Sequence, residues 1–158
     1  MVAESSIIIE HLQVYHPGAV RLVPQDPAEA LEARFMDRVF DNYVSTTQGA
    51  IVGNAIRPPE HRDPYGVDKA RADLDAAYAW LDQRMAGRTW AIGEAFTLAD
   101  CAAAPALFYA DWTHEIAPKF ANLRAYRARL NARPSFARCI EEARMYRSYF
   151  PLGAPDRD

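Results

Sequence analysis

The sequence predicts an all-α protein in which several helices form a bundle. Ala, Leu and Arg dominate the 158 residues, and the chain lacks the runs of β-branched and aromatic residues between turn residues that mark strands. Apolar residues instead recur at intervals of three and four, the spacing that places them on one face of a helix. Prolines and glycines divide these segments, and short links between helices are typical of a bundle.

The first predicted helix spans residues 4–15. It ends before Pro17 and Gly18, which together are a strong helix breaker, and a connector containing Pro24 and Pro27 follows. This helix is therefore expected to stand apart from the next one along the chain.

The second predicted helix is long and runs from residue 28 to about residue 56. It carries a stripe of apolar residues that we expect to face the core. Its members are Leu31, Phe35, Val39 and Tyr43, spaced four residues apart, with Met36, Phe40 and Val44 beside them. Three prolines between residues 57 and 66 predict a loop after it, because each proline lacks an amide donor and restricts the residue before it.

Four further helices complete the predicted bundle. Apolar residues at helical spacing fill residues 67–85, and Gly87 is a suitable stop. The other three helices are expected at residues 98–113, 123–133 and 136–149, with Pro134 setting the bend between the last two. The final residues, PLGAPDRD, are expected to be loosely held.

The bulk properties exclude several classes of protein. The net charge is −3 and the Lys and Arg residues are interleaved with acids, so no nucleic-acid-binding surface is expected. No segment has the roughly 20 apolar residues that cross a membrane, and residues 1–12 do not resemble a secretory signal. We therefore expect a cytoplasmic protein without a membrane partner. The two cysteines, Cys101 and Cys139, are expected to be reduced and buried.

The segment FTLAD, residues 96–100, predicts the start of a helix. Thr97 can accept a hydrogen bond from an amide of the first turn, while the carboxylate of Asp100 accepts one from the Thr97 amide. We interpret this pair as a structural capping box, because such pairs are common at helix starts and carry no chemistry of their own.

Three stretches of the sequence resemble cytosolic glutathione S-transferases. RTWAIGEAFTLADCAAAPAL and FANLRAYRARLNARPSFARC are similar to the central part of that family's helical C-terminal domain. AESSIIIEHL resembles the end of its thioredoxin-like N-terminal domain. The resemblance implies that residues 1–17 are the last helix of a truncated thioredoxin-like domain and that residues 18–158 form the C-terminal helical domain.

The resemblance also implies a place for glutathione at Glu4 and Ser5. In the family an acid here pairs with the ammonium group of the γ-glutamyl end, and the serine hydroxyl and amide receive its carboxylate. A helix N-terminus suits an anion, because its amides are unpaired and its dipole is positive. The alternative is that a serine simply caps the helix and Glu4 is solvated.

No catalytic residue is expected in this chain. The family's thiol-activating Ser, Tyr or Cys and its cis-proline loop precede the Glu-Ser pair, whereas only Met1, Val2 and Ala3 do so here. The chain is therefore expected to be inactive in isolation, with glutathione as co-substrate if it binds. The resemblance makes Phe40 and Tyr43 candidates for contact with a hydrophobic electrophile, with Tyr146 or Tyr149 also possible; the alternative is that these aromatic residues belong to the core.

Two other expectations concern partners. The four histidines form no cluster with metal-ligand spacing, so no metal site is predicted. Because the thioredoxin-like domain packs on the helical domain in the family, we expect exposed apolar surface and self-association, as a homodimer or otherwise. A non-catalytic helical module that binds other proteins is the alternative function, and a third account is that Met1 is a miscalled start and the full protein carries the missing thioredoxin-like half.

Overall fold

The computed structural model describes all 158 residues and confirms the all-α bundle. It contains no strand; a single bridge between Trp90 and Gly93 closes a tight turn. In chain order the helical elements are α1 (Ser5–Tyr15), α2 (Pro27–Val39), η1 (Phe40–Ser45), α3 (Thr46–Ala55), η2 (Pro59–His61), α4 (Pro64–Met85), α5 (Leu98–Thr113), α6 (Ala121–Ala132), α7 (Pro134–Ala143) and η3 (Arg144–Tyr149).

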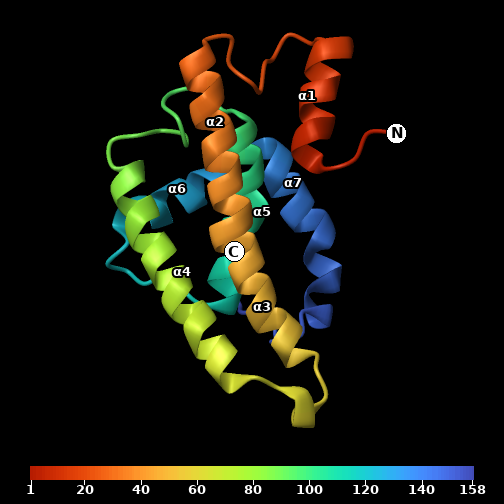
Figure 1. Cartoon of the computed structure of the whole chain (residues 1–158), viewed down its shortest axis with the longest axis vertical. Helices are drawn as coiled ribbons and strands as arrows, with labels where there is room; N and C mark the ends of the chain where they lie inside the picture. The colour runs from red at the N-terminus through yellow and green to blue at the C-terminus, as the bar shows by residue number, and fades with distance from the viewer.

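The bundle is built around α5, which lies behind the long rod formed by α2, η1 and α3 (Figure 1). Helix α4 runs beside this rod, α6 crosses behind, and α7 lies on the other side. The main core joins residues of α2, η1, α4, α5 and α6, among them the fully buried Met36, Leu74, Leu107 and Tyr126. Helix α1 is separate from this core and contributes no buried side chain.

The long second helix is interrupted where the sequence predicted continuity. Residues Phe40–Ser45 form a π-helix between α2 and α3, although the backbone stays helical through both junctions. The hydroxyl of Thr46 donates to the carbonyl of Asp41 at 3.0 Å, which gives a backbone carbonyl of this wider turn a hydrogen-bond donor. A π-turn of this kind inserts an extra residue into the helix and so changes which side chains face the core.

The predicted core stripe of this helix is therefore only partly right. Val39 is buried, as are the neighbouring Met36, Phe40 and Val44. Leu31, Phe35 and Tyr43 are instead 69%, 49% and 63% exposed. The helix carries two adjacent apolar stripes: the one formed by Met36, Phe40 and Val44 is covered, whereas the other is exposed except at Val39.

Helix α5 begins at the predicted capping box. Both reciprocal contacts between Thr97 and Asp100 are present, and the Thr97 amide donates to the Asp100 carboxylate at 2.8 Å. Asp100 is fully buried and also accepts from the amide of Ala91, at 2.8 Å, and from the hydroxyl of Tyr126, at 2.6 Å. One carboxylate thus joins the preceding loop, α5 and α6.

Two smaller predictions need correction. Cys139 is exposed on α7, because that helix covers the bundle with only one face, while Cys101 is partly buried and both thiols are free. Residues 151–158, predicted to be loosely held, are tied to the bundle by hydrogen bonds of Arg157 and Asp158, although none of these eight residues is buried. None of the helices combines the length and the apolar character that crossing a bilayer requires.

Candidate functional site

The backbone at the start of α1 is unusual. Glu4 has φ 69° and ψ 123°, and it is the only non-glycine residue of the chain with a positive φ. Side chains with a Cβ are strained in this region, and such strain occurs most often at ligand-binding and active sites. Simple helix capping does not require this conformation of Glu4.

The N-terminus of α1 is open to a ligand. Glu4 and Ser5 are exposed, and the residue at the N-cap makes no side-chain hydrogen bond to the first turn. The first amides of a helix have no partner within the helix, and the dipole makes this end positive. A carboxylate placed here would meet unpaired amides and the hydroxyl of Ser5.

Polar contacts hold α1 against α2 and the connector. The Ser6 hydroxyl donates to the buried carboxylate of Asp37, at 2.8 Å. Arg34 forms a two-pronged ion pair with Glu10, at 2.8 and 2.7 Å, and these hydrogen bonds lower the pKa of Glu10. The amide group of Gln13 bonds to the backbone of the connector at residues 22 and 23. Ser6 is therefore committed to positioning, which leaves Ser5 free for a ligand.

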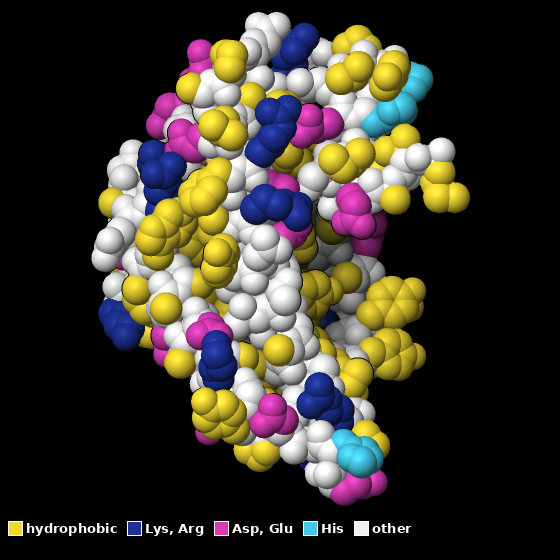
Figure 2. Space-filling view, in the orientation of Figure 1, with side chains coloured by type: hydrophobic (Ala, Val, Ile, Leu, Met, Phe, Trp, Pro, Cys, Tyr) yellow, Lys and Arg dark blue, Asp and Glu magenta, His cyan; other side chains and the backbone are white.

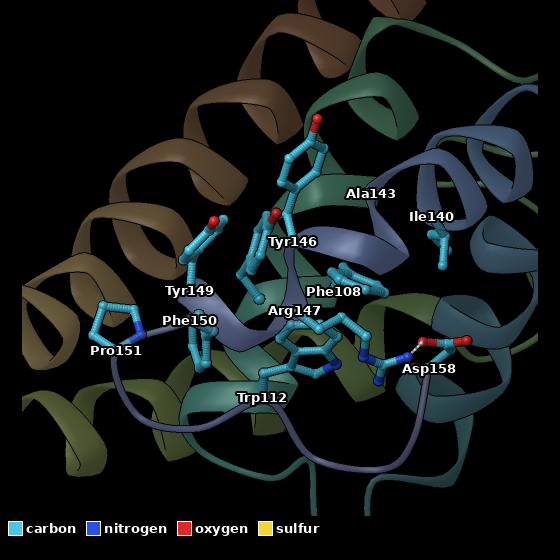
Figure 3. A pocket seen from close by; sticks show the side chains of 11 residues that line it. Phe108, Trp112, Ile140, Ala143, Tyr146, Arg147, Tyr149, Phe150, Pro151 and Asp158 are labelled. Carbon is cyan, nitrogen blue, oxygen red and sulfur yellow. Dashed lines mark hydrogen bonds and ion pairs between the residues drawn. The ribbon is translucent and has the colours of Figure 1, made fainter.

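An aromatic pocket of about 240 Å³ lies at the C-terminal end of α5, between this helix and η3 (Figure 3). Its walls are mainly aromatic, and Arg147 and Asp158 form a charged pair at one side. Tyr109 stacks on Phe150 with ring centres 6.2 Å apart, and Tyr146 stacks on Tyr149 at 6.3 Å. Flat apolar molecules suit such walls, because aromatic rings favour stacked and edge-on contacts.

A second hollow of about 640 Å³ lies in the groove between α2–η1–α3 and α4. Phe35, Tyr43 and Trp80 line it, with the Phe35 and Trp80 rings edge to face at 6.1 Å. In Figure 2 hydrophobic side chains gather on the front of the molecule between α2 and α4. The groove is thus an apolar surface on the outside of the bundle.

The structure does not bring the candidate residues together. Glu4 and Ser5 start α1, Tyr43 lines the α2–α4 groove, and Phe40 is fully buried in the core, where its ring centre lies 6.4 Å from that of Tyr126. Thr97 and Asp100 are buried at the start of α5. No group of three or more His, Cys, Asp or Glu side chains is placed to hold a metal ion.

Sequence reasoning missed the part of the aromatic pocket that α5 supplies. Phe108, Tyr109 and Trp112 come from an otherwise alanine-rich helix, and Phe150 follows η3. Their spacing of one and four residues places the three on one side of a helix end, a signal that could have been recognised. Tyr146 and Tyr149, considered from the sequence, do line this pocket.

Comparisons with known proteins agree with this architecture. Residues 49–134, more than half of the chain, match the family model of the glutathione S-transferase C-terminal domain. The glutathione S-transferase GstB of Escherichia coli is 32% identical over 106 residues, which cover 66% of this chain and 50% of the relative. The chain thus spans about half the length of this curated relative.

Solved structures show the same likeness. A glutathione S-transferase of Methylobacterium radiotolerans in complex with glutathione sulfonate has a TM-score of 0.74 at 29% identity, covering 86% of this chain and 65% of that one. A glutathione S-transferase of Methylobacillus flagellatus with glutathione bound has a TM-score of 0.77 at 25% identity, covering 86% and 68%. The helical bundle, the matched domain and these relatives together show that the chain belongs to the glutathione S-transferase family.

Proposed function

We propose that this chain provides the helical domain of a glutathione S-transferase and receives the γ-glutamyl end of glutathione at Glu4 and Ser5. The observation that carries the proposal is the strained backbone of Glu4 at the uncapped start of α1. The Glu4 carboxylate would pair with the ligand's ammonium group, while the Ser5 hydroxyl and the first amides of α1 would hold its carboxylate. Glutathione is then a co-substrate.

Relatives support this ligand. The structures from Methylobacterium radiotolerans and Methylobacillus flagellatus contain glutathione sulfonate and glutathione, respectively. A glutathione transferase of Burkholderia graminis, 25% identical with a TM-score of 0.75, binds two glutathione molecules per subunit. The proposal extends this ligand to the present chain through the chemistry at Glu4 and Ser5.

We assign residues 1–17 to the last helix of a thioredoxin-like domain and residues 18–158 to the helical domain. Helix α1 buries no side chain in the bundle and exposes Ile7, Ile8, Leu12 and Val14. A helix with such a surface is expected to pack against further apolar surface. The free thiols of both cysteines fit a cytoplasmic location, which we also propose.

We assign the hydrophobic co-substrate to the aromatic pocket rather than to Phe40 or Tyr43. Tyr109, Tyr146 and Tyr149 present partly exposed rings to this hollow, whereas Phe40 is covered on all sides. Tyr43 lies in the α2–α4 groove, which we assign to self-association between two copies. Contact between the apolar side chains of this surface and those of a second copy would remove from water a surface that is costly to leave exposed.

Within these 158 residues, no side chain can be assigned the activation of the glutathione thiol. That step needs a hydrogen-bond donor or positive charge close to the sulfur. Burial raises the pKa of the Cys101 thiol to about 11, and the neighbouring Asp100 charge adds to this effect, so this group is a poor substitute. The chain alone should not accelerate conjugation.

A chimaera tests the proposal. The 158-residue chain with glutathione and 1-chloro-2,4-dinitrobenzene should react no faster than buffer. Joining the thioredoxin-like part of the Escherichia coli relative ahead of this chain should produce turnover, and Glu4→Ala or Ser5→Ala should then lower kcat/KM by at least about tenfold. Glu60→Ala, an exposed acid on η2, is the matched control and should have no effect.

Three outcomes would contradict parts of this account. Turnover by the chain alone, abolished by Glu4→Ala, would show that the thiol is activated within it. A chimaera insensitive to both changes would remove Glu4 and Ser5 from the glutathione site. A folded chimaera without turnover would favour a non-catalytic role for the helical domain.

A further inference from the structure

Residues 151–158 form a strap that turns back across the end of α5 (Figure 3). The reversal occurs at Gly153, whose φ of 79° suits glycine, and its amide donates to the carbonyl of Phe150 at 2.9 Å. Pro151 and Asp158, near the two ends of the strap, both line the aromatic pocket. The strap therefore borders the place assigned to the hydrophobic co-substrate.

Arg147 is the centre of the contacts that hold the strap. It donates to the Asp158 carboxylate at 2.9 Å and to the carbonyls of Pro155 and Arg157 at 2.7 and 3.0 Å. Its guanidinium also lies 4.8 Å from the centre of the Trp112 ring. Arg144 adds a second hydrogen bond to Asp158 at 3.1 Å, and the Trp112 indole donates to the Arg157 carbonyl at 3.1 Å.

The far end of the strap is tied to a buried carboxylate. Arg157 donates to the Asp111 side chain at 3.2 Å and to its carbonyl at 2.8 Å. Asp111 also accepts from the Ile116 amide at 2.8 Å and forms an ion pair with the buried Arg127 at 3.2 Å. Asp111 therefore keeps a donor and a positive partner when Arg157 leaves. Release of the strap does not leave a buried charge without a partner.

The strap is held by charge rather than by apolar burial. None of residues 151–158 is buried, and the side chains that hold the strap are the exposed or half-buried Arg144, Arg147, Arg157 and Trp112. The ion pairs of Asp158 with Arg144 and Arg147 are partly exposed and are screened by salt, whereas only the Arg157 contact reaches the buried Asp111. Segments with few buried apolar contacts open most readily. The free-energy difference between the closed and the open strap is therefore small.

We propose that the strap is a lid on the aromatic pocket, latched by Asp158 on Arg147 and opened when this latch is released. Opening frees the Trp112 side of the pocket for an apolar aromatic molecule, and closing retains that molecule against Tyr109 and Phe150. The nature of the molecule rests on the proposed function, whereas the movement of the lid is independent of conjugation.

The test compares the full chain with Asp158→Asn and Arg147→Gln. Acrylamide quenching reports access to Trp112, isolated by subtracting the signal of a Trp112→Phe variant made in each background. Stopped-flow binding of the neutral probe N-phenyl-1-naphthylamine reports entry into the pocket. Arg138→Gln is the matched control, because Arg138 pairs only with Glu142, at 3.7 Å, and neither residue lines the pocket.

At about 50 mM salt, acrylamide should quench Trp112 at least about twofold more strongly in both latch variants than in the parent chain. The probe should enter the pocket of the variants about fivefold faster. Raising the salt to about 0.5 M should move the parent, but not the variants, toward these values, because salt screens the latch. Arg138→Gln should behave as the parent. Because Asp158→Asn removes only a surface charge, it separates release of the lid from unfolding, which circular dichroism would report for Arg147→Gln.

Unchanged Trp112 quenching in a folded Asp158→Asn protein would overturn the latch. Increased quenching without faster probe entry would overturn the lid, since the strap would then move without controlling the pocket. A chimaera that fails to conjugate would count against the proposed function but would leave both of these readouts intact as support for the lid.

Discussion

The two cysteines show how local surroundings give chemically identical side chains different reactivity. Cys101 lies on α5, where burial raises the pKa of its thiol to about 11 and the charge of Asp100 opposes the thiolate further. Cys139 is exposed on α7 and its thiol lies 3.2 Å from the Ser135 carbonyl. Because the thiolate is the reactive form, we expect Cys139 to react and Cys101 to be protected.

At pH 8, iodoacetamide should modify Cys139 readily and Cys101 only slowly, as measured by peptide mass spectrometry. Cys139→Ser should remove almost all labelling, while Cys101→Ser should remove little. The thiol of Cys101 has an ordinary pKa of 9.0 and a pKa of about 11 in the folded protein. The stability that comes from burying the neutral thiol is therefore complete below pH 9 and is lost as the pH rises to 11. Equal labelling of the two thiols in the folded protein would contradict this assignment.

Among the elements, α5 depends most on a single side chain at its start. The Asp100 carboxylate accepts hydrogen bonds from two backbone amides and from Tyr126, all at buried positions. Asp26, the N-cap of α2, also accepts from two amides, but at the exposed start of its helix. Both carboxylates accept backbone amides at a helix start, but Asp26 is the N-cap itself, whereas Asp100 lies at N3 and binds back to the N-cap Thr97 in a buried position.

Asp100→Ala should lower the free energy of unfolding by at least about 3 kcal/mol, because it leaves several buried donors without a partner. Asp26→Ala should cost only about 1 kcal/mol, the usual value for a solvent-exposed cap. Urea denaturation followed by circular dichroism measures both changes. Similar losses in the two variants would show that burial of the Asp100 network adds nothing to capping.

The comparison of sequence and structure is also clearest at the scale of elements. Proline, glycine and capping signals predicted the helices well, because these residues act on the backbone within a single turn. Periodicity could not decide which of two apolar stripes on residues 28–56 faces the core, because the π-turn at Phe40–Ser45 and the position of α5 decide it. Nor could it predict the strap, whose contacts join Arg157 to Asp111 across 46 residues.

The candidate site shows the same limit. Glu4 and Ser5 could be proposed from their resemblance to the family, but the backbone strain at Glu4 has no counterpart in the sequence pattern. The aromatic pocket joins α5 to η3, residues that lie about one fifth of the chain apart, so helical spacing alone could not assemble it.

Considered as a whole, the molecule leaves two apolar regions uncovered besides the aromatic pocket. One is the surface of α1, and the other is the α2–α4 groove, where Phe35 and Trp80 are 49% and 41% exposed. Figure 2 shows the hydrophobic patch of this groove and a hollowed right-hand edge between the N-terminal segment and the last helical segment. Surfaces of this kind usually mark contact with another protein surface.

We expect the chain to form dimers through the α2–α4 groove, measured by sedimentation velocity over a range of concentrations. Phe35→Ser should weaken association at least about tenfold, because it removes an aromatic anchor from the groove. Ile56→Ser is the matched control, since Ile56 is also an exposed apolar residue but does not line the groove. A parent protein that stays monomeric at high concentration would refute the expectation.

The central claim is that the start of α1 receives the γ-glutamyl end of glutathione, and an amide-resolved NMR titration of the 158-residue chain tests it most directly. Adding glutathione should shift the amide signals of Ser5, Ser6 and Ile7 in a saturable manner, and Glu4→Ala should abolish these shifts while the rest of the spectrum is preserved. Saturable shifts confined to other parts of the chain, or shifts at α1 that survive Glu4→Ala, would contradict the claim.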